Sequence, residues 1–379
     1  MNENVNPRQS LWSKLYSNKL AMISMIFITL FCLLAILGYT IVNDPTPFSN
    51  RQCLELTAKK PGYQASFLLK PNNFETPKVS WFSKMIWGQP DTAQYILADS
   101  LEFSGTTVII FRKGNGKFFE KEHYRAKDLG LTNITDVNTF KKHVLQHLYI
   151  TKHYLLGTDR LGRDVLSRLI IGARVSLSVG LVSVIISLLI GVWLGAMAGY
   201  FGGRADRVIM WFVNVSWAVP TLLLVIALTM VIGKGFWQIF IAIGLTMWID
   251  VTRLVRGQIM GLREKEYIEA CHAMGFGHFR IITKHLLPGI IGPVIVLSAA
   301  NFASAILIES GLSFLGVGIQ PPVPSWGNMI KEHYGYIILD KAYLAILPGL
   351  AIMLLTLAFT IIGNALRDAT DTKAPIAPS

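Results

Sequence analysis

Six long apolar stretches constrain the fold of this chain more than any other feature of its sequence. They cover residues 20–42 and, approximately, residues 175–200, 208–232, 236–251, 291–317 and 343–366. A helix of about 20 predominantly apolar residues crosses the hydrocarbon core of a bilayer. The sequence therefore predicts an all-α polytopic membrane protein with six transmembrane helices.

The composition fits this class and argues against a nucleic-acid-binding protein. Charged residues make up 15% of the chain, whereas a soluble domain carries about 25%. The net charge is +12, but the basic residues mostly flank the apolar stretches, as the positive-inside rule describes. No basic patch with interleaved aromatic residues is present, so we expect no nucleic-acid partner.

Basic residues also predict the orientation of the chain. The first apolar stretch is too long for a secretory signal and is preceded by Arg8, Lys14 and Lys19. Basic residues also lie in the short loops between stretches two and three and between stretches four and five, and after stretch six. This pattern places both termini in the cytoplasm.

The predicted organisation has five parts. A cytoplasmic N-terminus (1–19) leads into the first transmembrane helix (20–42), which is followed by an extracytoplasmic insertion (43–155). A membrane core (156–370) then carries the other five helices, and a cytoplasmic tail (371–379) ends the chain.

The insertion is predicted to be a small α+β domain. Gly105–Arg112 and Lys117–Tyr124 have the composition of strands, and the Lys113-Gly114-Asn115-Gly116 turn joins them as a hairpin. Thr139–Tyr149 has helical spacing of its apolar residues. His143 and His147 share a face of that helix, but without a further ligand we interpret them as solvated and expect no metal site.

The loop from Glu269 to Pro288 is the most informative motif. It has a polar helix, then Gly275, then a second amphipathic stretch that ends at Pro288. Glycine allows a sharp backbone turn, and proline is suited to the first turn of a helix. The loop is suited to docking on a cytoplasmic protein, although an ordinary connection between helices has the same pattern.

This loop resembles the EAA motif of the permeases of ATP-binding-cassette (ABC) importers. That motif has Glu-Ala-Ala, three residues, Gly, nine residues and Ile-x-Leu-Pro. The matching residues are Glu269, Ala270, Gly275, Leu287 and Pro288, while Cys271 stands for the second alanine and His285 for isoleucine. Cysteine is small, so the resemblance implies that tight packing is kept.

Three further segments resemble the C-type subunit of dipeptide, oligopeptide and nickel permeases. They are Leu156–Arg168, Arg253–Gln258 and Leu312–Met329. The resemblance implies the type I ABC importer fold (MetI-like) with six transmembrane helices, in a bacterial inner (plasma) membrane. The insertion departs from this family, whose loop at that place is much shorter.

The resemblance also implies a mechanism and a set of partners. A coupling loop (263–288) would rest on one of two cytoplasmic ATPase subunits, beside a homologous B-type permease and below an extracytoplasmic substrate-binding protein. The residues assigned to this coupling are Arg263, Glu264, Glu266, Tyr267, Glu269, Ala270, Cys271, Gly275, Leu287 and Pro288. The chain has no P-loop. We therefore expect no cofactor on it, ATP and Mg on the ATPases, and no catalysis by this subunit.

Candidate residues of a transport pathway lie within the apolar stretches. Glu309 is an ionisable residue at membrane depth, and either a pathway or gate role or a packing role fits it. Pro220 should kink the third helix, Asn214 is suited to hydrogen bonding between helices, and Asp250 has Arg253 nearby for an ion pair.

These observations favour one function over three alternatives. The chain is predicted to form half of a pathway for di- or oligopeptides in an ATP-driven importer. The alternatives are the same machinery carrying nickel or another small solute, an ion-coupled secondary transporter, and a membrane-anchored receptor or enzyme whose active part is the insertion.

Overall fold

The computed structural model describes residues 15–72, 79–114, 117–132, 134, 136–233 and 235–370. The predictions for residues 1–14 of the N-terminus, for the tail 371–379 and for the centre of the turn at 115–116 lie outside these residues.

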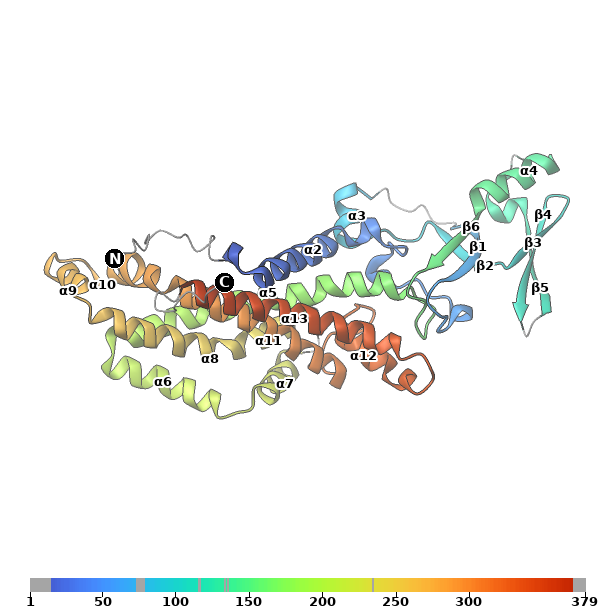
Figure 1. Cartoon of the computed structure of the whole chain (residues 1–379). Helices are drawn as coiled ribbons and strands as arrows, with labels where there is room; N and C mark the ends of the chain where they lie inside the picture. Colours follow the sequence, from blue (N-terminus) through green and yellow to red (C-terminus); the bar gives the residue numbers. More distant parts are fainter. Residues whose placement is uncertain are drawn as a thin grey trace. The chain divides into compact units, whose positions relative to one another are not determined.

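Within the described residues, five helical segments are long and apolar enough to cross a membrane. They are α2 (Lys19–Ile41), α5 (Val165–Phe201), α8 (Phe236–Arg263), the run His278–Leu315 that includes α11 (Ile291–Leu315), and α13 (Tyr343–Thr370). Helices α6 (Gly203–Trp217) and α7 (Thr221–Ile232) make a sixth crossing if they count as one bent span. The polytopic helical class predicted from the sequence is confirmed (Figure 1).

The third span is broken rather than merely kinked. Helices α6 and α7 meet at an angle of 94° across residues 218–220. Pro220 has no backbone N–H and disfavours a helical conformation of the residue before it, so the first helix ends and a new one begins after the proline.

Two helices extend beyond the apolar stretches that predicted them. Helix α5 begins at Val165, ten residues early, because the Asp164 side chain accepts a hydrogen bond from the Ser167 backbone N–H (3.1 Å) and caps the first turn. Helix α8 continues to Arg263 because its last turns are amphipathic, with Val255 and Ile259 fully buried. Arg253 and Arg256 therefore lie on a helix and not in a loop.

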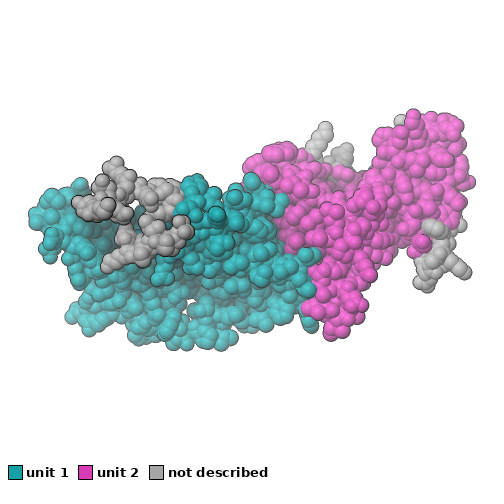
Figure 2. Space-filling view, in the orientation of Figure 1, with its two compact units in different colours: residues 1–35, 172–334, 345–379 teal, residues 36–171, 335–344 magenta. Residues whose placement is uncertain are grey.

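The chain divides into two compact units, which Figure 2 colours separately. Unit 1 comprises residues 1–35, 172–334 and 345–379, and unit 2 comprises residues 36–171 and 335–344.

In unit 1, a glycine face on α5 packs directly on α8. Gly191, Gly195 and Gly199 are spaced four residues apart, and a Cβ on any of them would lie within 2.8 Å of the α8 backbone. Small residues at this spacing let two membrane helices approach closely. Unit 1 also contains α9 (Glu266–Ala273), α10 (His278–Ile281) and α12 (Trp326–His333).

Unit 2 contains two antiparallel three-stranded sheets, with strand orders β2-β1-β6 and β3-β4-β5. Their strands are β1 (Tyr63–Pro71), β2 (Ala93–Leu97), β3 (Ser100–Ser104), β4 (Thr107–Gly114), β5 (Lys117–Arg125) and β6 (Tyr149–Tyr154). The predicted hairpin is present, since β4 pairs with β5 from Thr107 to Gly114.

The helices of unit 2 are short. Helix α4 (Val137–His143) ends earlier than predicted, because the chain continues as a wider π turn and then as strand β6. Helix α3 (Trp81–Trp87) was not predicted. Leu68, Val108, Ile110 and Phe140 form a buried core that joins both sheets to α4. The small α+β insertion is confirmed.

Candidate coupling site and transport cavity

Helix α9 presents one face to the spans and the other to solvent. Ile268 and Cys271 are buried in a cluster with Val255 and Ile259 of α8. Glu264, Glu266, Tyr267, Glu269 and Ala270 are exposed. The loop therefore combines a firm attachment to the membrane core with an outer face of carboxylates and one tyrosine.

Gly275 ends this helix in a Schellman motif. Its φ is +74°, its N–H donates to the His272 carbonyl (3.0 Å), and the Phe276 N–H donates to the Cys271 carbonyl (3.1 Å). This conformation suits glycine because a Cβ is disfavoured at positive φ. The turn reverses the chain so that Phe276 packs against the buried cluster that contains Cys271.

Both departures from the EAA motif have a place in the structure. Cys271 is buried in the cluster that attaches α9 to α8. The ring of His285 stacks on Phe276, with ring centroids 5.8 Å apart. Leu287 and Pro288 begin the 3-10 turn Leu287–Ile290, which leads into α11.

Arg263 holds the end of α5. Its guanidinium donates to the carbonyls of Gly199 (3.3 Å) and Tyr200 (3.0 Å), where a cation also complements the helix dipole. The sequence assigned Arg263 to an ATPase contact, and in this structure its guanidinium is engaged within the chain.

Tyr200, which sequence reasoning missed, links α5 to both parts of the coupling loop. Its hydroxyl lies 2.7 Å from Nδ1 of His278, and its ring stacks on His272 with centroids 6.2 Å apart. Because α5 is a long span, a movement of the loop can be passed directly to the membrane core through this contact.

The break between α6 and α7 opens onto a cavity of about 450 Å³ in unit 1. Its walls come from α6, α7, α8 and α11. The polar groups along it belong to Ser216, Thr246, Asp250, Asn301 and Ser304, and the apolar ones include Trp217, Pro220 and Leu307. A concave site of this size with a few polar groups is typical of a binding or transport cavity.

Asp250 lies in this cavity, and the ion pair predicted for it is absent from the described residues. The Arg253 guanidinium instead lies 4.3 Å from the centre of the Trp217 ring and donates to Asn214 (3.0 Å). Asp250 is exposed although it is on a membrane-spanning helix. A carboxylate at that depth is costly against lipid, so this face points to water or to another protein chain.

Glu309 is fully buried and does not line the cavity. Its Oε1 accepts a hydrogen bond from Ser313 Oγ (2.7 Å), which in turn accepts from the Ile319 N–H (3.1 Å). Ser325 and Asn328 of the following segment are also buried. Glu309 thus holds the segment that follows α11, and the geometry favours its packing role. Of the three pathway candidates, Pro220 lines the cavity and Asn214 holds Arg253 beside it.

The segment Leu156–Arg168 attaches the start of the insertion to the start of α5. Thr158 Oγ1 donates to the Leu56 carbonyl and accepts from the Lys59 N–H, and the Cys53 N–H donates to the Leu161 carbonyl (3.1 Å). The buried Asp159 accepts from Arg163 Nε (2.5 Å). This segment is therefore a structural joint within unit 2.

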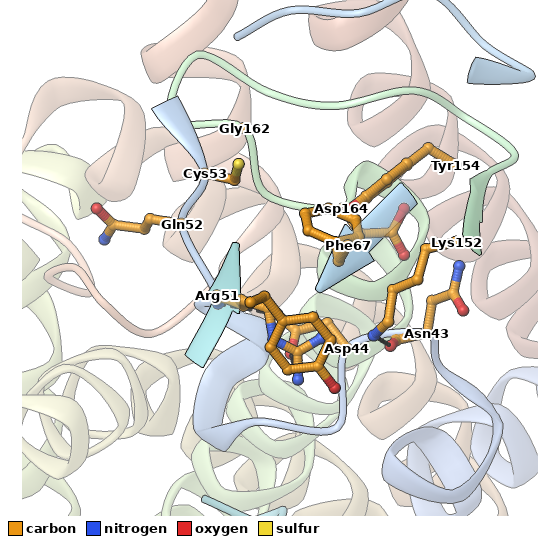
Figure 3. A pocket seen from close by; sticks show the side chains of 11 residues that line it. Asn43, Asp44, Arg51, Gln52, Cys53, Phe67, Lys152, Tyr154, Gly162 and Asp164 are labelled. Carbon is orange, nitrogen blue, oxygen red and sulfur yellow. Dashed lines mark hydrogen bonds and ion pairs between the residues drawn. The ribbon is translucent and has the colours of Figure 1, made fainter. Parts of the chain in front are cut away.

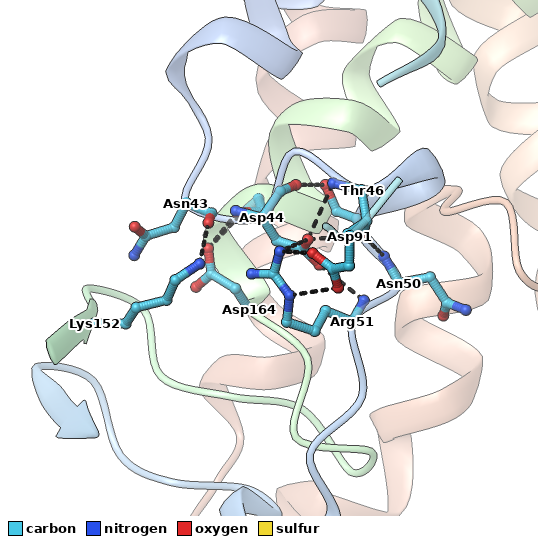
Figure 4. Close-up of polar contacts among 10 residues, drawn as sticks. Asn43, Asp44, Thr46, Asn50, Arg51, Asp91, Lys152 and Asp164 are labelled. Carbon is cyan, nitrogen blue, oxygen red and sulfur yellow. Dashed lines mark hydrogen bonds and ion pairs between the residues drawn. The ribbon is translucent and has the colours of Figure 1, made fainter. Parts of the chain in front are cut away.

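A second joint in unit 2 is a polar cluster at the end of α2 (Figure 4). Arg51 forms ion pairs with Asp91 and, at 3.7 Å, with Asp44. The Arg51 guanidinium lies 3.8 Å from the centre of the Tyr95 ring, and the Lys152 ammonium lies 4.7 Å from it. Asp44, Arg51, Tyr95 and Lys152 are among the residues that line a space of about 20 Å³, enough for a single water molecule (Figure 3). The cluster joins segments of the chain and leaves no room for a peptide.

The environment of Lys152 makes the stability of unit 2 depend on pH. Burial, and next the nearby Arg51, lower the pKa of Lys152 to about 8. Between pH 8 and about 10.4, Lys152 is therefore mostly protonated in the unfolded chain and mostly deprotonated in the folded chain. The unfolded chain binds more protons in that window, so the free energy of unfolding rises with pH across it.

We expect wild-type protein to gain thermal stability from pH 8 to about pH 10 relative to Lys152→Met, which lacks the titrating group. Unfolding temperatures of the purified protein across this range provide the measurement. Lys60→Met, which removes an exposed lysine, should follow the wild type. Parallel pH profiles for wild type and Lys152→Met would contradict this account.

Comparison with known proteins gives the family. A family model described as "Binding-protein-dependent transport system inner membrane component" matches residues 191–374, and one for the "N-terminal TM domain of oligopeptide transport permease C" matches residues 6–58. A glutathione transport system permease protein of Pectobacterium atrosepticum is 40% identical over 218 residues, which are 58% of this chain and 72% of the relative. The chain belongs to the permease family of ABC importers.

Other relatives of this permease carry peptide transport in their names. A di/tripeptide permease protein of Pseudomonas aeruginosa is 43% identical, over 58% of this chain and 72% of the relative. A dipeptide permease protein of Bacillus subtilis is 41% identical, over 60% and 71%. An inward-facing methionine ABC transporter has a TM-score of 0.45 at 20% identity, covering 54% of this chain and 97% of that chain.

The family matches also indicate the kinds of partner that the permease has and the membrane that contains it. It is a multi-pass component of an inner membrane transport system that depends on a binding protein, and this family implies ATPase and binding-protein partners. Residues 59–190 lie outside both family models. Neither model therefore covers most of the insertion.

Proposed function

We propose that this permease forms half of a translocation pathway for di- or oligopeptides and couples ATPase closure to alternating access. Its other half is a homologous B-type permease, and two ATPase subunits and an extracytoplasmic binding protein complete the importer. Relatives named for di/tripeptide, dipeptide and oligopeptide transport support the substrate class. ATP and Mg belong to the ATPases, and this subunit contributes contacts and motion.

The amphipathic build of α9 is the observation that carries the coupling proposal. The buried Ile268 and Cys271 fix the helix to α8, and Tyr200 and Arg263 fix the end of α5 to the same loop. A force on the exposed face therefore moves two spans together, as a rigid-body switch requires. ATP binding biases the switch because the ATPases contact this face differently in the two states.

Two large side chains on the exposed face give a direct test of ATPase docking. Tyr267 and Met274 are 46% and 62% exposed. In the Tyr267→Asp, Met274→Asp double variant, we expect at least about tenfold less ATPase to co-purify, since exposed aromatic and Met side chains dominate such contacts. The control Leu54→Asp changes an equally exposed apolar residue of unit 2 and should retain the ATPase. Full ATPase recovery with the double variant would refute docking at this face.

The orientation that we propose places both termini and α9 in the cytoplasm. Arg204, Arg207, Arg263 and Arg367 all fall on that side of the spans under this orientation, which follows the positive-inside rule. The insertion then faces the side on which a binding protein delivers substrate.

The cavity beside Pro220 is the proposed pathway segment of this subunit. Its break between α6 and α7 supplies a non-helical backbone next to polar side chains, and irregular backbone at membrane depth is found where it lines a cavity. Asp250 and Ser304 are exposed on its walls.

Cysteine accessibility tests this pathway. In a variant lacking Cys32, Cys53 and Cys271, Ser304→Cys should react with a charged thiol reagent at rates that differ at least about fivefold between nucleotide-free and ATP-trapped complex, because alternating access exposes the pathway to one side at a time. Leu181→Cys, on the exposed face of α5, should stay unreactive in lipid. Equal, slow reaction at both positions would count against the pathway.

A further inference from the structure

Helix α3 of the insertion displays aromatic side chains that the described residues of unit 2 leave exposed. Trp81, Phe82 and Trp87 are 65%, 61% and 70% exposed, and none of the seven residues of this helix is buried. A helix of this length is not stable by itself in water. Three exposed aromatic side chains within seven residues indicate a site of interaction.

The end of α3 is fixed to the C-terminal end of the first span (Figure 1). The Gln89 N–H donates to the Pro45 carbonyl (2.8 Å), and a Cβ on Gly88 would lie 3.1 Å from the Tyr39 ring. The Tyr39 hydroxyl in turn accepts a hydrogen bond from the Phe48 N–H (2.9 Å). Tyr39 belongs to the last turn of α2. The residues that directly follow α3 are therefore held at the end of α2, where this span leaves the membrane.

The length of α2 sets the depth of this point. Its 23 residues extend about 34 Å, slightly more than the roughly 30 Å of hydrocarbon in a bilayer. Its last turn therefore lies at the boundary between acyl chains and headgroups. Of the five long spans in the described part of the chain, α2 has the smallest buried share, 17%. Most of its surface is therefore not covered by this chain and is available to lipid up to the place where α3 is held.

We propose that α3 is a membrane-surface anchor whose partner is the lipid bilayer next to α2. Trp81, Phe82 and Trp87 enter the boundary between headgroups and acyl chains, where tryptophan is enriched in membrane proteins. Lys84 in the same helix supplies a cation for lipid phosphates. The anchor fixes the insertion against the membrane surface. It rests on α2 being a membrane span and is independent of the substrate that the permease carries.

Nitroxide labels at Phe82→Cys and Trp87→Cys test the anchor in the assembled importer in lipid nanodiscs. The background lacks the three native cysteines, Cys32, Cys53 and Cys271. Collision rates with oxygen, which concentrates in lipid, and with a water-soluble nickel chelate report the environment of each label. Leu30→Cys on the exposed face of α2 is the lipid control, and Val137→Cys, exposed in α4, is the water control.

We expect the oxygen-to-nickel ratio at positions 82 and 87 to exceed that of Val137→Cys at least about twofold, approaching that of Leu30→Cys. A ratio equal to the water control would overturn the anchor. Low collision rates with both reagents would also overturn it, because they would mark a face covered by another protein chain.

A second measurement leaves the apolar character of the helix intact. The double variant Trp81→Phe, Trp87→Phe lacks both tryptophans of α3. The difference in fluorescence between the wild-type importer and this variant is therefore the emission of these two side chains. In nanodiscs whose lipids carry bromine close to the carbonyl groups, we expect that emission to fall at least about twofold relative to unbrominated lipid. Unchanged emission would contradict the proposal, whatever the transport activity of the variant.

Discussion

Gly275→Val should lower ATP-driven uptake at least about tenfold while the permease still inserts and accumulates in the membrane. Gly275 ends α9 with a φ of +74°, and a residue with a Cβ loses about 1–2 kcal/mol in that conformation, with more for a β-branched side chain. A loss of this size shifts an equilibrium about tenfold. A Cβ there would meet open space, so the effect comes from the backbone and displaces the loop rather than the membrane core. Uptake and the amount of permease in the membrane are measured together.

Two variants separate backbone conformation from side-chain bulk at this turn. Gly275→Asn should keep most of the activity, since asparagine tolerates the left-handed conformation better than other residues. Gly277→Val should be close to wild type, because Gly277 has a φ of −66° and also faces open space. Normal uptake by Gly275→Val would remove this turn from the coupling mechanism.

Gly162→Ala should prevent unit 2 from folding. Gly162 has a φ of +72°, and a Cβ there would overlap the backbone carbonyl of Cys53. Neither segment can move away easily, because the Cys53 N–H donates a hydrogen bond to the Leu161 carbonyl and the Gly162 N–H donates one to the Asp159 carbonyl. Strain and overlap together place this substitution among the exceptional ones that cost more than about 4 kcal/mol.

The expected result is loss of full-length permease from the membrane and rapid proteolysis within the insertion. Gly62→Ala provides the matched control, since Gly62 also has positive φ, +79°, but a Cβ there would meet open space. This control should cost only about 1–2 kcal/mol and accumulate normally. Equal abundance and protease resistance of the Gly162→Ala and Gly62→Ala proteins would show that the joint between the insertion and α5 is not needed.

The coupling loop was predictable because its signals are local. A polar helix, a glycine and a proline follow one another within 20 residues from Glu269 to Pro288, and the Schellman turn at Gly275 forms from backbone bonds between close neighbours. The six apolar stretches are local signals as well, which is why the helical membrane class followed from the sequence.

The contacts that hold the loop could not be predicted, because they join distant parts of the chain. Tyr200 meets His278, which lies 78 residues later, only when α5 and the loop are packed together. The cluster of Asp44, Arg51, Asp91 and Lys152 likewise comes from separate segments. The spacing of these residues in the sequence indicates neither arrangement.

The membrane core shows both the value and the limit of residue-type reasoning. Pro220 correctly indicated an interruption of the third span, although its 94° bend depends on how α6 and α7 pack. Asp250 was paired with Arg253 because of their spacing, but the Arg253 guanidinium lies over Trp217 instead. The carboxylate is therefore left facing the cavity, a position that only the packed structure provides.

Energy coupling is the central claim, and uptake into proteoliposomes measures it most directly. The importer, reconstituted with its ATPases and binding protein, is supplied with a labelled mixture of di- and tripeptides. We predict that uptake requires ATP on the side of α9, stops when ATP is exhausted and is unchanged when an ionophore dissipates the proton gradient. Uptake that continues without ATP and stops with the ionophore would contradict the account and support an ion-coupled transporter.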